Sequence, residues 1–274
     1  MVSFPNAKIN LGLNVVSRRN DGFHNIETVF FPLAELTDAL EIVEADRFSF
    51  ETTGVAIDIS DDNNLCVRAY RLMKEKYALP PVAMHLHKNI PTGAGLGGGS
   101  SDASFTIRAL NTVFDLQLNS KEMKHIAMQL GSDCAFFIDN VPSKASGRGE
   151  ILEALALDLS GLYLALVKPD IHISTKDAYR SVVPQPAEYN LVETLKLPPA
   201  KWKYRLINVF EQSIFPQNPA IADIKAQMYL HGALYASMSG SGSTIFGLFE
   251  KPPKTAGFAD IVPGISCFEK IYLL

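Results

Sequence analysis

A glycine-rich segment offers the clearest chemistry in this sequence: Ile90-Pro-Thr-Gly-Ala-Gly-Leu-Gly-Gly-Gly-Ser-Ser101. Five of its residues are glycines, so backbone N–H groups can approach an anion closely. The hydroxyls of Ser100 and Ser101 could donate hydrogen bonds or coordinate magnesium. Apolar residues at helical spacing between Ala103 and Phe114 predict a helix, whose N-terminus attracts negative charge. The segment therefore predicts a binding site for nucleotide phosphates.

Two other phosphate-binding motifs fit this segment less well. The Walker A motif requires Gly-Lys followed by Ser or Thr, and the sequence lacks this triplet. The dinucleotide fingerprint is matched by Gly93, Gly95 and Gly98, but it normally follows an almost entirely apolar strand, whereas this strand carries His85 and His87. An NAD-dependent oxidoreductase stays open as a less favoured alternative. A glycine turn that binds nothing is also disfavoured, because ordering five glycines costs considerable backbone entropy.

The elements around this segment mix strands and helices in an irregular order. Alternating apolar residues predict a half-buried strand at 82–87, and a capping-box pattern predicts a helix over 119–130. An apolar run predicts a buried strand at 162–167, and two strands joined by a tight turn are expected at 234–238 and 244–249. The absence of a regular strand–helix–strand order favours an α+β fold. We expect a domain boundary near residue 158, which gives domains 1–158 and 159–274.

Composition excludes several classes of protein. The 274 residues are 47% hydrophobic and 20% charged, as in an ordinary globular protein, and the formal net charge of -4 argues against nucleic acid as a partner. No run reaches the roughly 18 apolar residues of a membrane span, and no signal peptide is expected. Three widely spaced cysteines predict neither a disulfide framework nor a zinc site. We therefore expect a cytoplasmic protein that does not bind membranes.

The segment Pro91-Thr-Gly-Ala-Gly-Leu-Gly-Gly-Gly-Ser-Ser101 resembles the central motif of the GHMP kinases, which include galactokinase, homoserine kinase and mevalonate kinase. The resemblance continues almost end to end through five motifs. It implies a two-domain fold, with an N-terminal mixed sheet and helices, a ferredoxin-like C-terminal domain, and the active site in the cleft between them. It also implies ATP as cofactor, with Mg²⁺, bound by residues Pro91, Gly93, Gly95, Gly97, Gly98, Gly99, Ser100 and Ser101.

The second motif is the N-terminal segment Pro5-Asn-Ala-Lys-Ile-Asn-Leu11. Alternation places Lys8 and Asn10 on one side of a strand, and the residues alone favour two solvated polar side chains on an edge strand. The resemblance reverses this interpretation. It implies that Lys8 is a catalytic residue and that Asn10 contacts the substrate.

The third motif, Gly131-Ser-Asp-Cys-Ala-Phe-Phe137, contains a candidate base. The carboxylate of Asp133 could simply cap the next helix, or it could accept a proton during catalysis. The motif resembles the family's Gly-x-Asp-x-Pro-Phe-Phe, which implies that Asp133 is the catalytic base. Ala135 replaces the usual proline, so the turn is expected to be less rigid.

The fourth motif, Asn63-Asn-Leu-Cys-Val-Arg-Ala69, begins a predicted helix, for which either asparagine would serve as N-cap. The resemblance implies that the segment lines the adenine pocket. It adds Asn64, Leu65 and Lys88 to the residues that bind the cofactor.

Two further regions are implied to bind the substrate. The turn at Asp21-Gly22 leads to Phe23 and His24, whose counterparts in the family pack against cytosine. Phe23 replaces the usual tyrosine, which retains ring stacking and loses the hydroxyl. The fifth motif, Ala236-Ser-Met-Ser-Gly-Ser-Gly-Ser243, contains a glycine turn that from its residues alone needs only to form a hairpin. The remaining residues implied to contact the substrate are Thr175, Tyr179, Gly240, Ser241 and Gly242.

The resemblance therefore implies transfer of the ATP γ-phosphoryl group to the 2-hydroxyl of a cytidine diphosphate ester of methylerythritol, in the non-mevalonate route to isoprenoid precursors. Other acceptors of the family, namely mevalonate, homoserine or a sugar, stay open. So does a nucleotide-binding protein without catalysis, and a monomer and a homodimer are both compatible with the sequence. A metal site at His85-x-His87 is disfavoured, because no neighbouring carboxylate or cysteine supports it.

Overall fold

The computed structural model describes residues 1–56, 60–253 and 266–274. They form two compact units that are interleaved along the chain. The first unit consists of Met1–Lys8, Pro32–Thr92 and Gly97–Val141, and the second of Ile9–Phe31, Gly93–Leu96 and Pro142–Leu274. Strands β2 (Asn6–Arg18) and β3 (His24–Thr37) are long enough to contribute to both. The boundary expected near residue 158, between an N-terminal and a C-terminal domain, stays a prediction.

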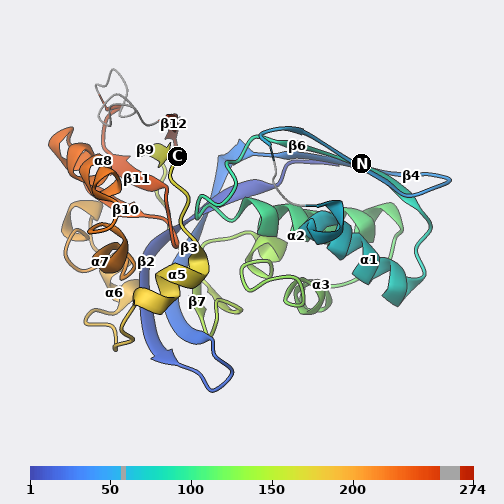
Figure 1. Ribbon diagram of the computed structural model, residues 1–274, viewed down its shortest axis with the longest axis horizontal. Helices are drawn as coiled ribbons and strands as arrows, with labels where there is room; N and C mark the ends of the chain where they lie inside the picture. Colours follow the sequence, from blue (N-terminus) through green and yellow to red (C-terminus); the bar gives the residue numbers. More distant parts are fainter. Residues whose placement is uncertain (57–59, 254–265) are drawn as a thin grey trace. The chain divides into compact units, whose positions relative to one another are not determined.

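The first unit is built on a four-stranded sheet with the order β1-β4-β6-β5. Its strands are β1 (Val2–Ser3), β4 (Ala39–Glu44), β5 (Ser49–Gly54) and β6 (Val82–Lys88), and only the β5–β6 pair is parallel. Helices α1 (Leu65–Tyr77), α2 (Gly98–Val113) and α3 (Ser120–Ala127) lie on one face of this sheet (Figure 1). The short elements η1 (Asp61–Asn63) and α4 (Phe136–Asp139) complete the unit.

Local sequence signals account for the ends of these helices. Asn64 caps α1, because its Oδ1 accepts a hydrogen bond from the backbone N–H of Cys66 at 2.9 Å. Asn119 and Glu122 form the predicted capping box at the start of α3. Along β6, alternate residues from Val82 are buried, which confirms the predicted half-buried strand.

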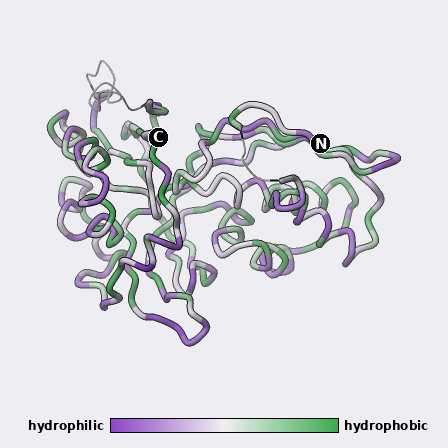
Figure 2. Tube along the Cα trace, in the orientation of Figure 1, coloured by the Kyte–Doolittle hydropathy of each residue, from purple (hydrophilic) through white to green (hydrophobic). Residues whose placement is uncertain are grey.

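A second sheet, with the order β2-β3-β7-β8, contains the two long strands and the short strands β7 (Ser143–Ser146) and β8 (Ile151–Ala154). Thr28 of β3 lies opposite Ala145 of β7 in an antiparallel pair. The connection between β2 and β3 is hydrophilic, as the purple segment at its tip in Figure 2 shows. The aromatic residue Phe23 follows this tip directly.

The C-terminal part of the second unit is an antiparallel sheet with the order β10-β11-β9-β12. Its strands are β9 (Tyr163–Pro169), β10 (Tyr235–Met238), β11 (Ile245–Phe249) and β12 (Cys267–Leu273). Helix α8 (Pro219–Leu230) packs against β10 and β11. The other helical segments are α5 (Thr175–Ser181), α6 (Leu191–Leu195), η2 (Pro199–Lys201) and α7 (Glu211–Ile214).

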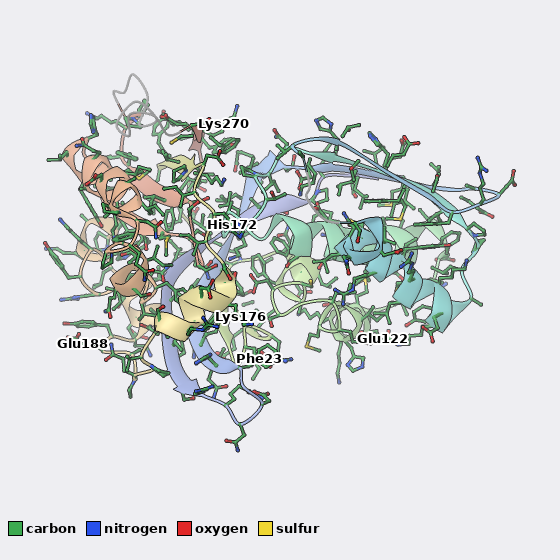
Figure 3. The ribbon with its side chains drawn as sticks, in the orientation of Figure 1. Phe23, Glu122, His172, Lys176, Glu188 and Lys270 are labelled. Atoms are coloured by element: carbon green, nitrogen blue, oxygen red, sulfur yellow. The ribbon has the colours of Figure 1, made fainter. Side chains whose placement is uncertain are left out.

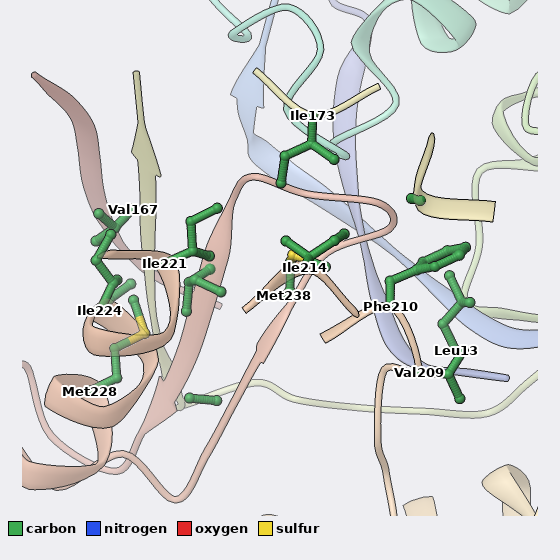
Figure 4. Close-up of a cluster of buried hydrophobic side chains, with 14 of the residues drawn as sticks. Leu13, Val167, Ile173, Val209, Phe210, Ile214, Ile221, Ile224, Met228 and Met238 are labelled. Atoms are coloured by element: carbon green, nitrogen blue, oxygen red, sulfur yellow. The ribbon is translucent and has the colours of Figure 1, made fainter. Parts of the chain in front are cut away.

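An apolar core holds the second unit together. Ile221, Ile224 and Met228 project from α8 toward Met238 and Val167 of the sheet (Figure 4). Burying a side chain of this size contributes roughly 1.5–3 kcal/mol each. The core thus fixes the strands that lead into and out of the turn at 239–244.

Among the residues that the structure describes, no helix combines the length and the apolar character needed to cross a bilayer. All three cysteines lie within the described ranges, and none of them forms a disulfide.

Candidate active site

The first half of the glycine-rich loop has a backbone that requires glycine. Gly93 and Gly95 have φ values of +59° and +76°, in the left-handed region that L side chains rarely adopt. A Cβ on Gly95 would lie only 2.0 Å from the carbonyl oxygen of Ser239. The loop and the turn at 239–244 therefore touch backbone to backbone, which only glycine permits at this position.

Gly95→Ala is expected to weaken ATP binding, because the new methyl group would collide with the Ser239 carbonyl oxygen and force the loop to move. Backbone strain of about 1–3 kcal/mol corresponds to a roughly fivefold to hundredfold rise in Kd. Calorimetric titration with a non-hydrolysable ATP analogue measures this change. Gly232→Ala is the control, since Gly232 also has a positive φ but open space around it. An unchanged Kd for Gly95→Ala would contradict this view of the loop.

The second half of the loop leads into the 16-residue helix α2. Gly97 is the N-cap, with φ of +73°, and no described side chain caps the helix. The N–H groups of the first turn are thus available to an anion, which the helix dipole also attracts. Ser101 Oγ is buried and has no hydrogen-bond partner among the described residues. These donors fit a bound nucleotide phosphate.

Lys8 and Asp133 form an ion pair in the first unit. The Lys8 Nζ lies 3.5 Å from Asp133 Oδ2, and the side chain of Asp133 is 33% exposed. Burial lowers the pKa of the Lys8 ammonium, and the negative charge of Asp133 partly offsets this effect. The arrangement places a buried cation beside a carboxylate that solvent can reach.

The interpretation of Lys8 and Asn10 as solvated residues on an edge strand is wrong. They are only 3% and 2% exposed. The physical reason for Lys8 is that its aliphatic stem packs against Gly97, where an added Cβ would lie 3.1 Å from Lys8 Cε. Asn10 is buried because its amide donates to Thr28 Oγ1 at 3.0 Å and its backbone N–H donates to Ser239 Oγ at 3.3 Å.

The structure also argues against Asp133 as a helix cap. Helix α4 has Ala135 as its N-cap, with no capping hydrogen bond from a described side chain. Asp133 contributes to this turn only through its carbonyl oxygen, which accepts from the backbone N–H of Phe136 at 3.2 Å.

Of the residues implied for adenine, Asn64 and Leu65 begin α1. Asn64 is buried and uses its side-chain oxygen as the helix cap. Leu65 faces the phosphate loop, because its Cδ1 would lie 3.8 Å from a Cβ on Gly99. Leu65 therefore lies against the loop, whereas the Asn64 side chain already has a local partner.

The ammonium group of Lys88 is not free to contact a nucleotide, because two carboxylates enclose it. Its Nζ is buried between Asp38 and Asp102, and it donates to Asp102 Oδ2 at 2.7 Å. Asp38 also accepts the backbone N–H groups of Asn89 and Ile90, at 2.6 and 2.8 Å. These three charged residues tie the end of β6 and the start of the loop to the first turn of α2.

The shared burial of Lys88 and Asp102 affects the pKa of each. Burial raises the pKa of Asp102 to about 8, although the Lys88 ammonium acts in the opposite direction. For Lys88 itself, burial lowers the pKa, but the two carboxylates outweigh it and the net pKa is raised. Sequence reasoning missed Asp38 and Asp102, because nothing in the local pattern pairs them with a lysine 50 and 14 residues away.

In the second unit, two of the three ring side chains implied for cytosine binding, those of His24 and Tyr179, lie together. The rings of His24 and Tyr179 stack with centroids 5.1 Å apart, and Tyr179 also meets Phe210 edge to face at 4.9 Å. Burial lowers the pKa of His24. Phe23 is 54% exposed near the tip of the β2–β3 connection, with the Arg148 guanidinium over its ring at 5.0 Å (Figure 3). Sequence reasoning missed Arg148 and Phe210.

The hydroxyls of Thr175 and Ser241 are 3.0 Å apart, so the structure brings together the start of α5 and the turn of the fifth motif. Gly240 and Gly242 both have positive φ, which explains their residue type in this turn. The predicted hairpin is confirmed, since Met238 of β10 pairs with Ile245 of β11.

The two histidines on β6 have a simple local role. Thr53 Oγ1 lies 3.0 Å from His85 Nε2 and 2.9 Å from His87 Nδ1. Within the described ranges, no group of three or more metal-binding side chains gathers anywhere.

A glycine-rich loop that leads into a helix N-terminus, with a lysine–carboxylate pair in the same unit as that helix, fits a small-molecule kinase. The chain belongs to the GHMP kinases: residues 64–147 match the model of the GHMP kinases N terminal domain, and residues 192–262 match that of the GHMP kinases C terminal domain. It is therefore an ATP-dependent phosphotransferase.

Two relatives that share one name are similar to this chain over almost its whole length. The chain is 51% identical to a 4-diphosphocytidyl-2-C-methyl-D-erythritol kinase of Parabacteroides distasonis, over 92% of this chain and 93% of that protein. A protein of the same name from Bacteroides thetaiotaomicron is 48% identical over 98% and 99%.

Solved structures of kinases have the same fold as this chain. The crystal structure of a 4-(cytidine 5'-diphospho)-2C-methyl-D-erythritol kinase has a TM-score of 0.82 and 31% identity, and the match covers 99% of this chain and 98% of that one. A homoserine kinase from Cytophaga hutchinsonii has a TM-score of 0.74 at 18% identity, over 97% and 94%, and therefore shares the fold alone.

Proposed function

We propose that this kinase transfers the ATP γ-phosphoryl group to the 2-hydroxyl of 4-diphosphocytidyl-2-C-methyl-D-erythritol, in the non-mevalonate pathway to isoprenoid precursors. The observation that carries the chemistry is the Lys8–Asp133 pair at 3.5 Å, in the same unit as the N-terminus of α2. The choice of acceptor is supported by the relatives of that name, which are about half identical over almost the whole chain.

In this mechanism the acceptor hydroxyl needs a base, because an alcohol is a weak nucleophile at neutral pH. Asp133 accepts its proton as the oxygen attacks the γ-phosphorus. Lys8, whose Nζ lies 3.5 Å from Asp133 Oδ2, stabilises the negative charge that develops on the attacking oxygen.

The phosphate chain of ATP lies along the loop from Pro91 to Ser101, whose amides replace the hydration of the phosphates. When bound, Mg²⁺ supplies neutralisation of the phosphate charge. Ser101 is the side chain that would hold the Mg²⁺ ion, since its buried hydroxyl has no partner among the described residues. Asn64, Leu65 and the backbone at Lys88 are assigned to the adenine end.

The cytidine part of the acceptor is assigned to Phe23, His24 and Tyr179. An exposed aromatic face suits a flat base, and stacking is independent of a tyrosine hydroxyl. Asn10 and Thr175 and the turn Gly240-Ser241-Gly242 are assigned to the remainder of the acceptor. His24 and Tyr179 already stack on each other, so the base extends this stack rather than entering it.

Phe23→Ala should raise the KM for the cytidine acceptor and leave the KM for ATP unchanged. Loss of one base–aromatic stack is worth about 1–3 kcal/mol, or roughly a fivefold to hundredfold change in affinity. Steady-state kinetics with each substrate varied in turn measures both constants. Phe23→Tyr retains the ring and should behave like the wild type. Equal KM values for Phe23→Ala and the wild type would remove Phe23 from the binding site.

An ADP-release assay over a panel of alcohols tests the proposed function. The panel contains the cytidine diphosphate methylerythritol, mevalonate, homoserine and galactose, with CDP as a competitor. Activity confined to the cytidine substrate and inhibition by CDP are expected. Preference for another alcohol would assign a different acceptor, and ATP binding without transfer to any alcohol would point to a nucleotide-binding protein. A cytoplasmic location, and the choice between monomer and homodimer, stay predictions.

A further inference from the structure

Asn208 is a buried asparagine that no motif of the sequence includes. Its Nδ2 donates two hydrogen bonds of 2.8 Å, to the carbonyl oxygens of Met238 and Gly240. Its Oδ1 accepts from the backbone N–H of Phe210 at 3.0 Å. Every polar position of this side chain is thus used, and both donors hold the backbone on either side of Ser239.

Ser239 connects the same turn to the phosphate loop. Its hydroxyl donates to the carbonyl oxygen of Gly95 at 2.9 Å, and it accepts the backbone N–H of Asn10 at 3.3 Å. A second link runs from the N–H of Thr244 to the carbonyl oxygen of Ala94 at 3.3 Å. Since a Cβ on Gly95 would touch the Ser239 carbonyl oxygen, the turn and the loop have no room to move independently.

Glu211 holds the strand just before this turn. Its Oε1 accepts from the backbone N–H of Met238 at 2.8 Å and from Ser237 Oγ at 3.1 Å, while Oε2 pairs with Lys225 at 2.5 Å. Asn208 and Glu211 therefore form hydrogen bonds with adjacent parts of one backbone segment: Asn208 donates to its carbonyl groups, and Glu211 accepts from its N–H group.

The position of Asn208 itself is fixed by the fold of the second unit. The N–H of Leu13 donates to the carbonyl oxygen of Ile207 at 2.8 Å, and the N–H of Val209 donates to that of Leu13 at 2.9 Å. Val209 and Phe210 then enter the apolar core (Figure 4). Asn208 is thereby anchored on both sides, so it can hold the turn without moving itself.

We propose that Asn208 is a positioning residue of the phosphoryl transfer: its amide holds the turn at 239–244, and this turn sets the conformation of the phosphate loop at 93–96. The inference rests on the proposed function for its kinetic consequences. Asn208 is itself buried. It acts through Ser239, whose hydroxyl and carbonyl group meet Gly95.

A purely structural role would have a different signature. Loss of buried hydrogen bonds would lower the free energy of unfolding, but each molecule that remained folded would bind ATP normally. A positioning role also changes the kinetics of the folded molecules, because small misplacements of a phosphate site are costly for transfer.

Asn208→Asp is the sharpest test, since it keeps the shape and the acceptor for Phe210 but replaces two donated hydrogen bonds with a carboxylate that faces carbonyl oxygens. With folded protein, well below its Tm, kcat/KM for ATP should fall roughly tenfold to a hundredfold. The KM for ATP should rise, and calorimetry should give a weaker Kd for an ATP analogue.

Two controls separate position from charge and from stability. Asn190→Asp introduces the same charge where the asparagine is only an acceptor, for the N–H of Glu193, and should leave the kinetics unchanged. Met73→Ala removes core packing on α1, in the first unit, and should lower the Tm with normal kinetics per folded molecule. Wild-type kinetics for folded Asn208→Asp would overturn the inference.

If Asn208→Asp does not fold, Ser239→Ala tests the next link, because it removes only the hydroxyl that joins the turn to Gly95. A raised KM for ATP supports the inference, and an unchanged one overturns it. Wild-type protein in the same assay keeps the two proposals apart: failure to phosphorylate the cytidine acceptor would refute the proposed function, while the ATP affinities would still test Asn208.

Discussion

Asp133→Asn should lower kcat by about a hundredfold to ten-thousandfold while the protein folds normally, because general base catalysis typically contributes this much. Asparagine has nearly the same shape as aspartate but cannot take up the proton of the acceptor hydroxyl. The cost in stability is expected to be small, since Asp133 is one-third exposed and burial already lowers the pKa of Lys8, which can lose its charge when its partner is removed. Single-turnover kinetics with saturating ATP measures the chemical step.

Asp139→Asn provides a matched control for this prediction. Asp139 lies six residues further along the same segment and pairs with Lys124 and Ser120 on the surface. The control should transfer phosphate at the wild-type rate. Near-wild-type turnover of Asp133→Asn would remove Asp133 from the mechanism.

Lys88→Met should lower the free energy of unfolding by about 3–5 kcal/mol, because it leaves the buried carboxylates of Asp38 and Asp102 without their cation. The folded variant must then keep a proton that the unfolded chain releases near its usual carboxyl pKa. Because burial raises the folded-state pKa of Asp102, stability is lost as pH rises above about 4, the usual carboxyl pKa of the unfolded chain. The loss should therefore be larger at pH 8 than at pH 5, as measured by urea unfolding.

Lys124→Met is the comparison for this second prediction. It removes the exposed ion pair with Asp139, which is worth about 0–1 kcal/mol. A loss below about 1 kcal/mol for Lys88→Met as well would contradict a structural role for the three buried charges.

The sequence predicted those features that depend on local pattern. The phosphate loop and the capping box at Asn119 follow from residues a few positions apart, and the structure confirms their backbone. The resemblance implies a catalytic role for Lys8 and for Asp133, but no local pattern pairs them, because the residues are 125 positions apart (133 − 8). Their distance of 3.5 Å is a property of the fold.

The features that sequence reasoning missed all depend on distant partners. Alternation along β2 predicts a solvated side with Lys8 and Asn10, but it does not say that Gly97 packs against Lys8, and residues on both sides of the strand are buried. Lys88 was expected to contact adenine, whereas its ammonium group pairs with Asp38, which lies 50 residues earlier. Asn208 carried no signal at all, since an asparagine in an ordinary segment gives no hint of the two carbonyl groups it holds.

The position of the new phosphate group tests the central proposal most directly. Phosphorus NMR of the product formed by the wild-type enzyme from ATP and 4-diphosphocytidyl-2-C-methyl-D-erythritol reports on the carbon that bears the ester. The 2-hydroxyl is on a tertiary carbon, which carries no proton, so the new monoester signal should show no splitting by a carbinol proton. A monoester signal that is split by protons, or ADP release without a new ester, would contradict the proposal.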